Sequence, residues 1–117
     1  MIRIILAAVL TLAPLSAHAL DRITDEGAFL ALIAGKSLSN RLYGITLQVT
    51  PEGEIAGDAL GWDVSGAWRW TDGYFCREMA WGGDPIPYNC QLVEASGNEV
   101  RFTSDQGSGA SASFKLR

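Results

Sequence analysis

Hydrophobic and polar residues alternate along much of this 117-residue chain, in short runs that turn residues separate. In the clearest run, residues 43–50, large apolar side chains occupy every second position from Tyr43 to Val49. Residues 100–103 and 112–117 repeat the pattern. A period of two puts successive side chains on opposite faces of a strand, so these runs predict β-strands with one buried face.

Turn signals separate the predicted strands at hairpin spacing. Asp72-Gly73 predicts a two-residue hairpin that leads into a strand over residues 74–80. Residues 81–88 are predicted to form a second return stiffened by two prolines, and residues 59–65 a glycine-broken loop. About eight short strands without an intervening helix predict a mainly β fold, an antiparallel meander curled into a barrel-like sheet, since closure removes exposed edges.

One short helix is predicted ahead of the strands, from a cap at Thr24 or Asp25 through Ala34. Gly35 suits the left-handed residue that follows a helix. Three apolar side chains share one face of this helix: Phe29, Leu30 and Ile33. An amphipathic helix of this kind is expected to close one end of a small β domain.

Residues 1–19 are predicted to be a secretory signal peptide. Arg3 precedes an apolar run, Pro14 breaks it, and Ala17-His18-Ala19 forms a small-x-small cleavage site. The run is shorter than the roughly 20 residues that span a bilayer, so no membrane span is expected in the mature chain. Residues 20–117 are then a single β domain, located in the periplasm or secreted.

Cys76 and Cys90 are predicted to form a structural disulfide. An exported chain meets an oxidising compartment, and an even number of cysteines leaves none over. The two residues would face each other across the second hairpin. No C-x-x-C motif is present, which argues against a redox site.

The amino-acid composition limits the kinds of catalysis, metal binding and partner that are expected. His18, in the signal peptide, is the only histidine, so histidine-based catalysis and histidine-ligated metals are not expected. The remaining 98 residues hold eight basic and 13 acidic side chains, a net charge of −5, which argues against nucleic acid as a partner. No calcium-loop spacing of carboxylates occurs, and no metal site is predicted.

Two motifs are candidates for cofactor binding or catalysis. Residues 107–112 match G-x-G-x-x-A, but the following residues alternate like a strand where a dinucleotide site needs a helix, so no cofactor is expected. Asp72, Glu78 and Asp84 are the carboxylates nearest the aromatic cluster, and a glycosidase needs such a pair. Simpler roles in turns and cross-strand pairs are favoured, and a carboxylate-based hydrolase remains the alternative function.

The motifs DGYFCRE and WGGDPIPYNCQ, together with a signal peptide and a short helix ending in Gly, give the chain a family resemblance. It resembles small exported alphaproteobacterial proteins of unknown function, over most of residues 24–116. Some of these proteins carry the label dihydrodipicolinate reductase, an activity that the length and expected compartment of this chain do not support. The resemblance implies fold and location and transfers no functional residue.

The hairpin register assigns the side chains to two faces. Opposite residues share a face, so Trp68, Trp70, Phe75 and Arg77 lie together, and Gln91 joins them if Cys76 opposes Cys90. If this aromatic face is the core, Arg77 must meet an acid, stack on Trp68 at the barrel rim, or hold an anionic ligand. A one-residue slip would reverse every assignment.

The predicted function is therefore binding or interaction, with no catalysis expected. Candidate ligand-binding residues are Arg77, Gln91, Trp68, Trp81, Ile86 and Tyr88. The last three belong to the proline-stiffened return, and the competing interpretation is that they fold over the barrel end as a lid. The partner is predicted to be a small ligand, an envelope component or another protein.

Overall fold

The computed structural model describes residues 19–117, and the predicted signal peptide lies outside this range apart from Ala19. These residues form one α-helix, one 3-10 turn and nine strands. In chain order the elements are β1 (Asp21–Ile23), α1 (Glu26–Ile33), β2 (Leu38–Asn40), β3 (Ile45–Val49), β4 (Glu54–Ala59), β5 (Trp62–Thr71), β6 (Tyr74–Trp81), β7 (Asp84–Ser96), β8 (Glu99–Thr103), η1 (Asp105–Gly107) and β9 (Ser111–Leu116).

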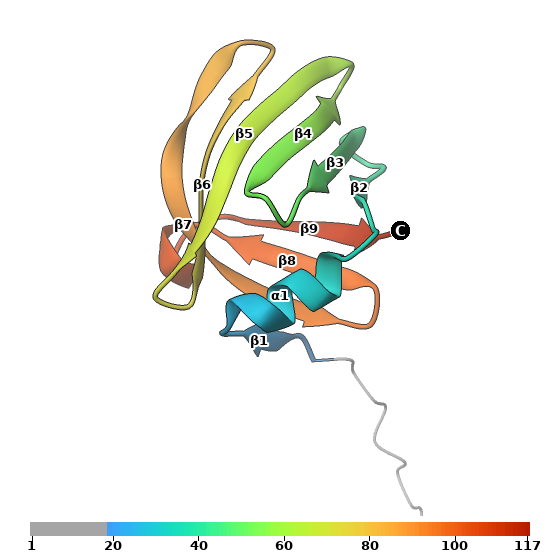
Figure 1. Ribbon diagram of the computed structural model, residues 1–117. Coiled ribbons are helices and arrows are strands. Elements are labelled where there is room, and N and C mark those ends of the chain that lie inside the picture. Colours follow the sequence, from blue (N-terminus) through green and yellow to red (C-terminus); the bar gives the residue numbers. More distant parts are fainter. Residues whose placement is uncertain (1–18) are drawn as a thin grey trace, which may run out of the picture.

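The strands form a closed antiparallel barrel, as predicted (Figure 1). The sheet order is β1-β7-β6-β5-β4-β3-β2-β9-β8, and β8 pairs back to β7, so that eight strands complete the ring. The long strand β7 makes this closure. Its residues 84–91 pair with β6, residues 92–96 pair with β8, and residues 93–95 also pair with β1.

The predicted register of the central hairpins is confirmed. Trp68 opposes Arg77 across β5 and β6, and Phe75 opposes Gln91 across β6 and β7. Both turn residues, Asp72 and Gly73, have positive φ, as a type I′ turn requires. The aromatic face therefore points into the barrel, and Arg77 points inward with it.

Three local predictions were wrong. Residues 62–65 belong to β5, and the return between β5 and β4 is only Leu60-Gly61. Residues 84–88 belong to β7 rather than to a loop. Strand β3 begins at Ile45 and not at Tyr43, because Gly44 has a φ of 58° and ends the preceding turn, which leaves Tyr43 58% exposed.

Helix α1 closes one end of the barrel (Figure 1). Asp25 caps it by accepting a hydrogen bond from the Ala28 amide at 3.1 Å, and Gly35 follows it with a φ of 67°. Phe29 projects from the helix, is 0% exposed, and contacts four aromatic rings. These rings belong to Trp68, Trp70, Phe75 and Phe102, at centroid distances of 5.2–6.4 Å.

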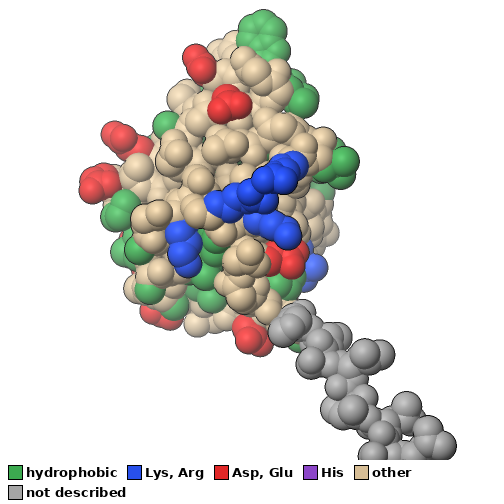
Figure 2. All heavy atoms as spheres, turned by 90° about the vertical axis from the view of Figure 1, so that its right-hand side faces the viewer, with side chains coloured by type: hydrophobic (Ala, Val, Ile, Leu, Met, Phe, Trp, Pro, Cys, Tyr) green, Lys and Arg blue, Asp and Glu red, His purple; other side chains and the backbone are tan. Residues whose placement is uncertain are grey.

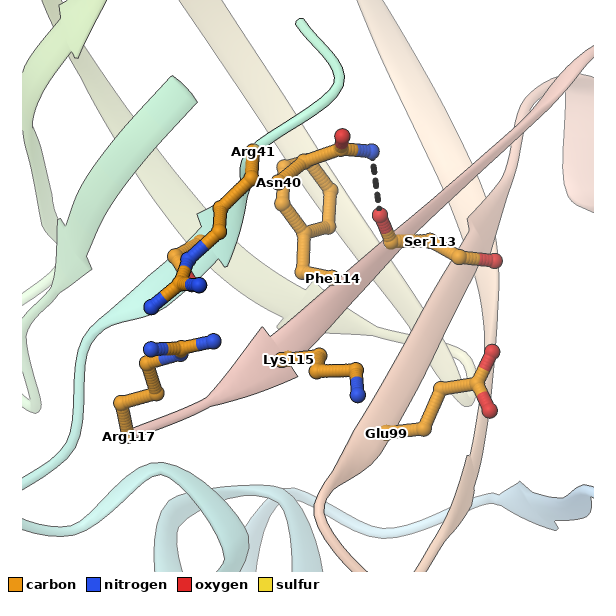
Figure 3. Close-up of a pocket in the computed structure, with 8 residues that line it drawn as sticks. Asn40, Arg41, Glu99, Ser113, Phe114, Lys115 and Arg117 are labelled. Atoms are coloured by element: carbon orange, nitrogen blue, oxygen red, sulfur yellow. Dashed lines mark hydrogen bonds between the residues drawn. The ribbon is translucent and has the colours of Figure 1, made fainter. Parts of the chain in front are cut away.

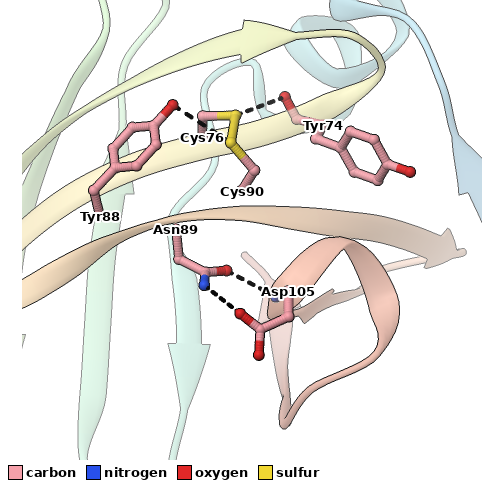
Figure 4. The surroundings of a disulfide bond; sticks show 6 residues. All are labelled: Tyr74, Cys76, Tyr88, Asn89, Cys90 and Asp105. Carbon is pink, nitrogen blue, oxygen red and sulfur yellow. Dashed lines mark hydrogen bonds between the residues drawn. A yellow bond between two sulfur atoms is a disulfide. The ribbon is translucent and has the colours of Figure 1, made fainter.

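The predicted disulfide between Cys76 and Cys90 is present and joins β6 to β7 on the outer side of the barrel (Figure 4). The Tyr88 hydroxyl lies 3.4 Å from the Cys90 Sγ. Beside it, Asn89 donates from Nδ2 to the Asp105 carboxylate at 2.8 Å and accepts from the Asp105 amide at 2.9 Å. The same stretch of β7 therefore carries the disulfide and anchors the η1 turn.

Truncation of Phe29, the side chain that α1 places in the end of the barrel, should destabilise the fold. We expect Phe29→Ala to lower the free energy of unfolding by about 3–5 kcal/mol, because it leaves a cavity among four aromatic rings. Urea denaturation would measure the change. Leu42→Ala, which shortens an 83% exposed side chain, is the control and should change stability little. A Phe29→Ala protein as stable as the control would show that the helix is not part of the core.

Removing the disulfide should destabilise the barrel by about 3 kcal/mol, because the bond closes a 15-residue loop in the unfolded chain. The double variant Cys76→Ala/Cys90→Ala tests this by urea denaturation beside the oxidised protein. A reductant should shift the unfolding midpoint of the parent and leave that of the double variant unchanged. Equal midpoints for parent and variant would contradict the prediction.

Candidate functional site

A cavity of about 310 Å³ lies inside the barrel, on the far side of the core from α1. Its walls are mostly apolar, with a few polar side chains among them. The lining residues are Leu38, Leu47, Val49, Ile55, Phe75, Arg77, Met79, Ile86, Gln91, Phe102, Ser104, Ala110, Ser111, Ala112 and Phe114. A concave, mainly apolar site with a small number of polar groups is typical of a small-molecule pocket.

Two aromatic rings form the floor of this cavity. Phe75 and Phe102 contact Phe29 of the helix and also line the cavity. Their ring centroids are 5.1 Å apart, so together they separate the helix-filled end of the barrel from the hollow end. The helix thus closes one end of the barrel and leaves a cavity towards the other.

Arg77 is the charged residue of the cavity lining. The residue is only 8% exposed, and its Nη1 donates a hydrogen bond of 2.6 Å to the Pro87 carbonyl. Within residues 19–117, no carboxylate lies within ion-pair distance of it, since Arg101 and Glu94 form the only pair found there. Desolvation lowers the pKa of the Arg77 guanidinium from its usual value, yet an arginine stays charged near neutral pH.

A β-bulge explains the partner of Arg77. Arg77 pairs with Asn89 and Met79 with Ile86, so β7 has one residue more than β6 between these two pairs. The extra residue lies at Pro87-Tyr88, and a bulge interrupts the ladder, which frees backbone groups for other partners. The same shift keeps Ile86 on the cavity side beside Met79. Of the three partners that the sequence analysis considered for Arg77, none is this carbonyl.

Further polar side chains lie near one side of the cavity. The Gln91 Nε2 donates to the Ser104 hydroxyl at 3.3 Å, and both residues line the cavity. Ser111, at the start of β9, shares a 2.8 Å hydrogen bond with Thr103. Ser104 and Ser111 lie on either side of the η1 turn, so the polar side of the cavity lies next to this turn.

The six predicted ligand-binding residues lie in three different places. Arg77, Gln91 and Ile86 line the cavity together. Trp68 lies in the core, where its indole N–H donates to the Thr50 carbonyl at 2.9 Å. Trp81 and Tyr88 are exposed on the outside, and the Trp81 indole donates to the Ala59 carbonyl at 2.9 Å. Ligand binding by any of the six remains a prediction.

The sequence analysis missed Met79, Ser104 and Ser111 as lining residues. Met79 could have been found, because it lies two residues after Arg77 and so shares its face. Ser104 and Ser111 lie on either side of a turn that the sequence reads only as a loop. Their position depends on how η1 packs against β7, which the Asn89–Asp105 hydrogen bonds hold.

The three candidate catalytic carboxylates do not form a pair. Asp72 lies in the turn before the eight-residue strand β6, and Asp84 begins β7 at the opposite end of β6, which places them roughly 25 Å apart. Glu78 is exposed on the outer face between them. The paired carboxylates of a glycosidase lie within about 5–10 Å of each other, so this arrangement does not match one.

The glycine motif of residues 107–112 runs from η1 directly into β9. The helix that would hold a pyrophosphate is therefore replaced by a strand. Across residues 19–117 there is no cluster of three or more potential metal-ligating side chains. The helix in this part of the chain is too short to cross a membrane.

No family model, curated protein or solved structure matches this chain.

Proposed function

We propose that this protein is an exported binding protein whose barrel interior holds a small amphipathic anion, such as a medium-chain fatty acid. The apolar tail would lie along the cavity wall and the anionic group would meet Arg77. The observation that carries the proposal is a buried guanidinium that lines an apolar cavity and that, among residues 19–117, has a backbone carbonyl but no carboxylate as its partner.

Electrostatics supports an anionic ligand. A buried charge is costly unless it is paired, and the Pro87 carbonyl supplies only a partial negative charge to one of the guanidinium nitrogens. Arginine has five N–H donors in a planar fork, so donors remain for a second acceptor. A carboxylate bound there would neutralise the charge and form strong, charge-assisted hydrogen bonds. The amide of Gln91 lines the same cavity and is a further potential donor.

The size and lining of the cavity support a short apolar tail. Its volume of about 310 Å³ is near the lower end of the range of about 300–1,000 Å³ for small-molecule sites. Burial of each methylene group contributes about 0.8 kcal/mol. A single chain of moderate length therefore suits the cavity better than a two-chain lipid.

Export is part of the proposal. The disulfide between Cys76 and Cys90 is compatible with an oxidising compartment, where such bonds persist. Together with the predicted signal peptide, the disulfide supports a periplasmic or secreted location. Binding is favoured over the hydrolase alternative because the candidate carboxylates lie apart and outside the cavity.

The role of Arg77 can be tested by calorimetric titration with decanoate and decanol. We expect Arg77→Met, which keeps a long apolar side chain, to weaken decanoate binding by about tenfold or more, because a charge-assisted hydrogen bond is lost. Decanol binding should be unchanged or stronger. Arg69→Met is the matched control, since Arg69 is exposed on the outer face of β5. If both arginine variants bound decanoate equally well, Arg77 would not be the anchor.

The location of the site can be tested separately by filling the cavity. Ala112 opposes Phe102 in the ladder between β8 and β9 and lines the cavity. We expect Ala112→Phe to remain folded, as circular dichroism would show, and to lose binding of both decanoate and decanol, because the ring occupies the ligand volume. Unchanged binding of both compounds would place the site elsewhere on the protein.

A further inference from the structure

The outer wall of the barrel carries a second hollow, formed by strands β2, β9 and β8. It has a volume of about 390 Å³ and is lined by Ser39, Asn40, Arg41, Glu99, Ser113, Phe114, Lys115 and Arg117 (Figure 3). Basic side chains gather near the middle of this face (Figure 2). Of these residues only Phe114 also lines the interior cavity, so the two hollows are lined by almost entirely different side chains.

The strand register gathers the basic side chains on the outer face. Lys115 opposes Ser39 across β9 and β2, and two backbone hydrogen bonds, of 2.9 and 3.0 Å, pair Arg117 with Ser37. Lys115 and Arg117 are two residues apart and therefore share a face. Arg41 follows Ser39 by two residues, just beyond the end of β2. The alternate residues of these strands, Leu38 and Leu116, are buried in the core.

These three cations have no acidic partner in the part of the chain that the structure describes. The one ion pair there joins Arg101 to Glu94. Glu99 opposes Lys115 and lines the hollow, but it lies beyond ion-pair distance. Among its side chains the hollow therefore has three positive charges and one negative charge, on a chain whose formal net charge is −4.

Arg41 and Arg117 line the same hollow, and Figure 3 shows their guanidinium ends pointing toward one another. Like charges at short range repel, and an anion between them would turn this repulsion into attraction. The hydroxyls of Ser39 and Ser113 form no side-chain hydrogen bond with other residues in the range 19–117 and add neutral donors. The Asn40 amide is already engaged, since it donates to the Ser113 carbonyl at 2.9 Å.

From this arrangement we propose that the outer hollow binds a phosphate monoester. A phosphate monoester carries a charge of about −1.5 to −2 near neutral pH, which matches the excess positive charge of the hollow better than a single carboxylate does. Arginine binds phosphate oxygens with two parallel N–H donors, and lysine adds a point charge. The phosphate could belong to a soluble metabolite or to a lipid headgroup at the envelope surface.

Two probes distinguish these sources. Glycerol 3-phosphate, titrated by calorimetry, represents a soluble monoester. Phosphatidylcholine vesicles that contain phosphatidic acid, in a sedimentation assay, represent a lipid monoester. Binding of glycerol 3-phosphate supports the soluble source, and binding of the vesicles alone supports the headgroup. Vesicles with phosphatidylglycerol at the same surface charge should bind more weakly, because that lipid offers only a diester.

Charge-matched variants test whether binding depends on the arginines of this hollow. We expect Arg41→Gln and Arg117→Gln each to weaken binding of the active probe by about tenfold or more, because each removes a charge-assisted contact. Arg69→Gln, an exposed change of the same charge on the outer face of β5, should have little effect. Decanoate binding should be the same in all three variants, so this test is independent of the interior cavity.

Three results would overturn the proposal. Failure of both monoester probes to bind would show that the hollow is not a phosphate site. An equal loss in Arg69→Gln would show that net charge, rather than this hollow, determines binding. Equal binding of phosphatidylglycerol and phosphatidic acid vesicles would show a general attraction to anionic surfaces instead of recognition of a monoester.

Discussion

The register of β5, β6 and β7 determines which side chains enter the barrel. The side-chain period in a strand is two, so a slip of one residue would turn Phe75 and Arg77 outward and bring Cys76 inward. The Asp72-Gly73 turn fixes one side of this register, and the disulfide between Cys76 and Cys90 fixes the other. The aromatic contacts with α1 depend on the same alignment, because Phe29 packs on rings from β5, β6 and β8.

The inward position of Arg77 follows from this register and gives the interior its chemistry. A barrel of this size can fill its interior with side chains alone, as it does around Phe29. On the other side of Phe75 and Phe102, however, the lining leaves a cavity in which a guanidinium faces apolar walls. The bulge in β7 supplies one carbonyl, which holds the arginine without neutralising it. The proposed binding of an anion in the interior depends on this incomplete pairing.

Much of this architecture could be predicted from local signals. The Asp72-Gly73 turn and the alternation over residues 45–49 act within a few residues and are confirmed. Of the two predicted caps, Thr24 and Asp25, the structure has Asp25. Residues 84–88 were misread, because Pro85 and Pro87 argue against a strand unless one edge is free of ladder hydrogen bonds. The bulge at Pro87-Tyr88 has no sequence signature of its own. The grouping of Arg41 with Lys115 and Arg117 arises only when β2 pairs with β9, across more than 70 residues of chain.

We propose that Arg77 anchors an anion whose tail lies in the barrel. A crystal structure of the protein with 10-bromodecanoic acid would test this proposal, since anomalous scattering locates the bromine independently of the carboxylate. We expect a carboxylate within hydrogen-bond distance of the Arg77 guanidinium, and a bromine peak among apolar lining residues such as Leu47 and Ile55. A carboxylate bound at another residue, or a bromine peak outside the barrel, would contradict it.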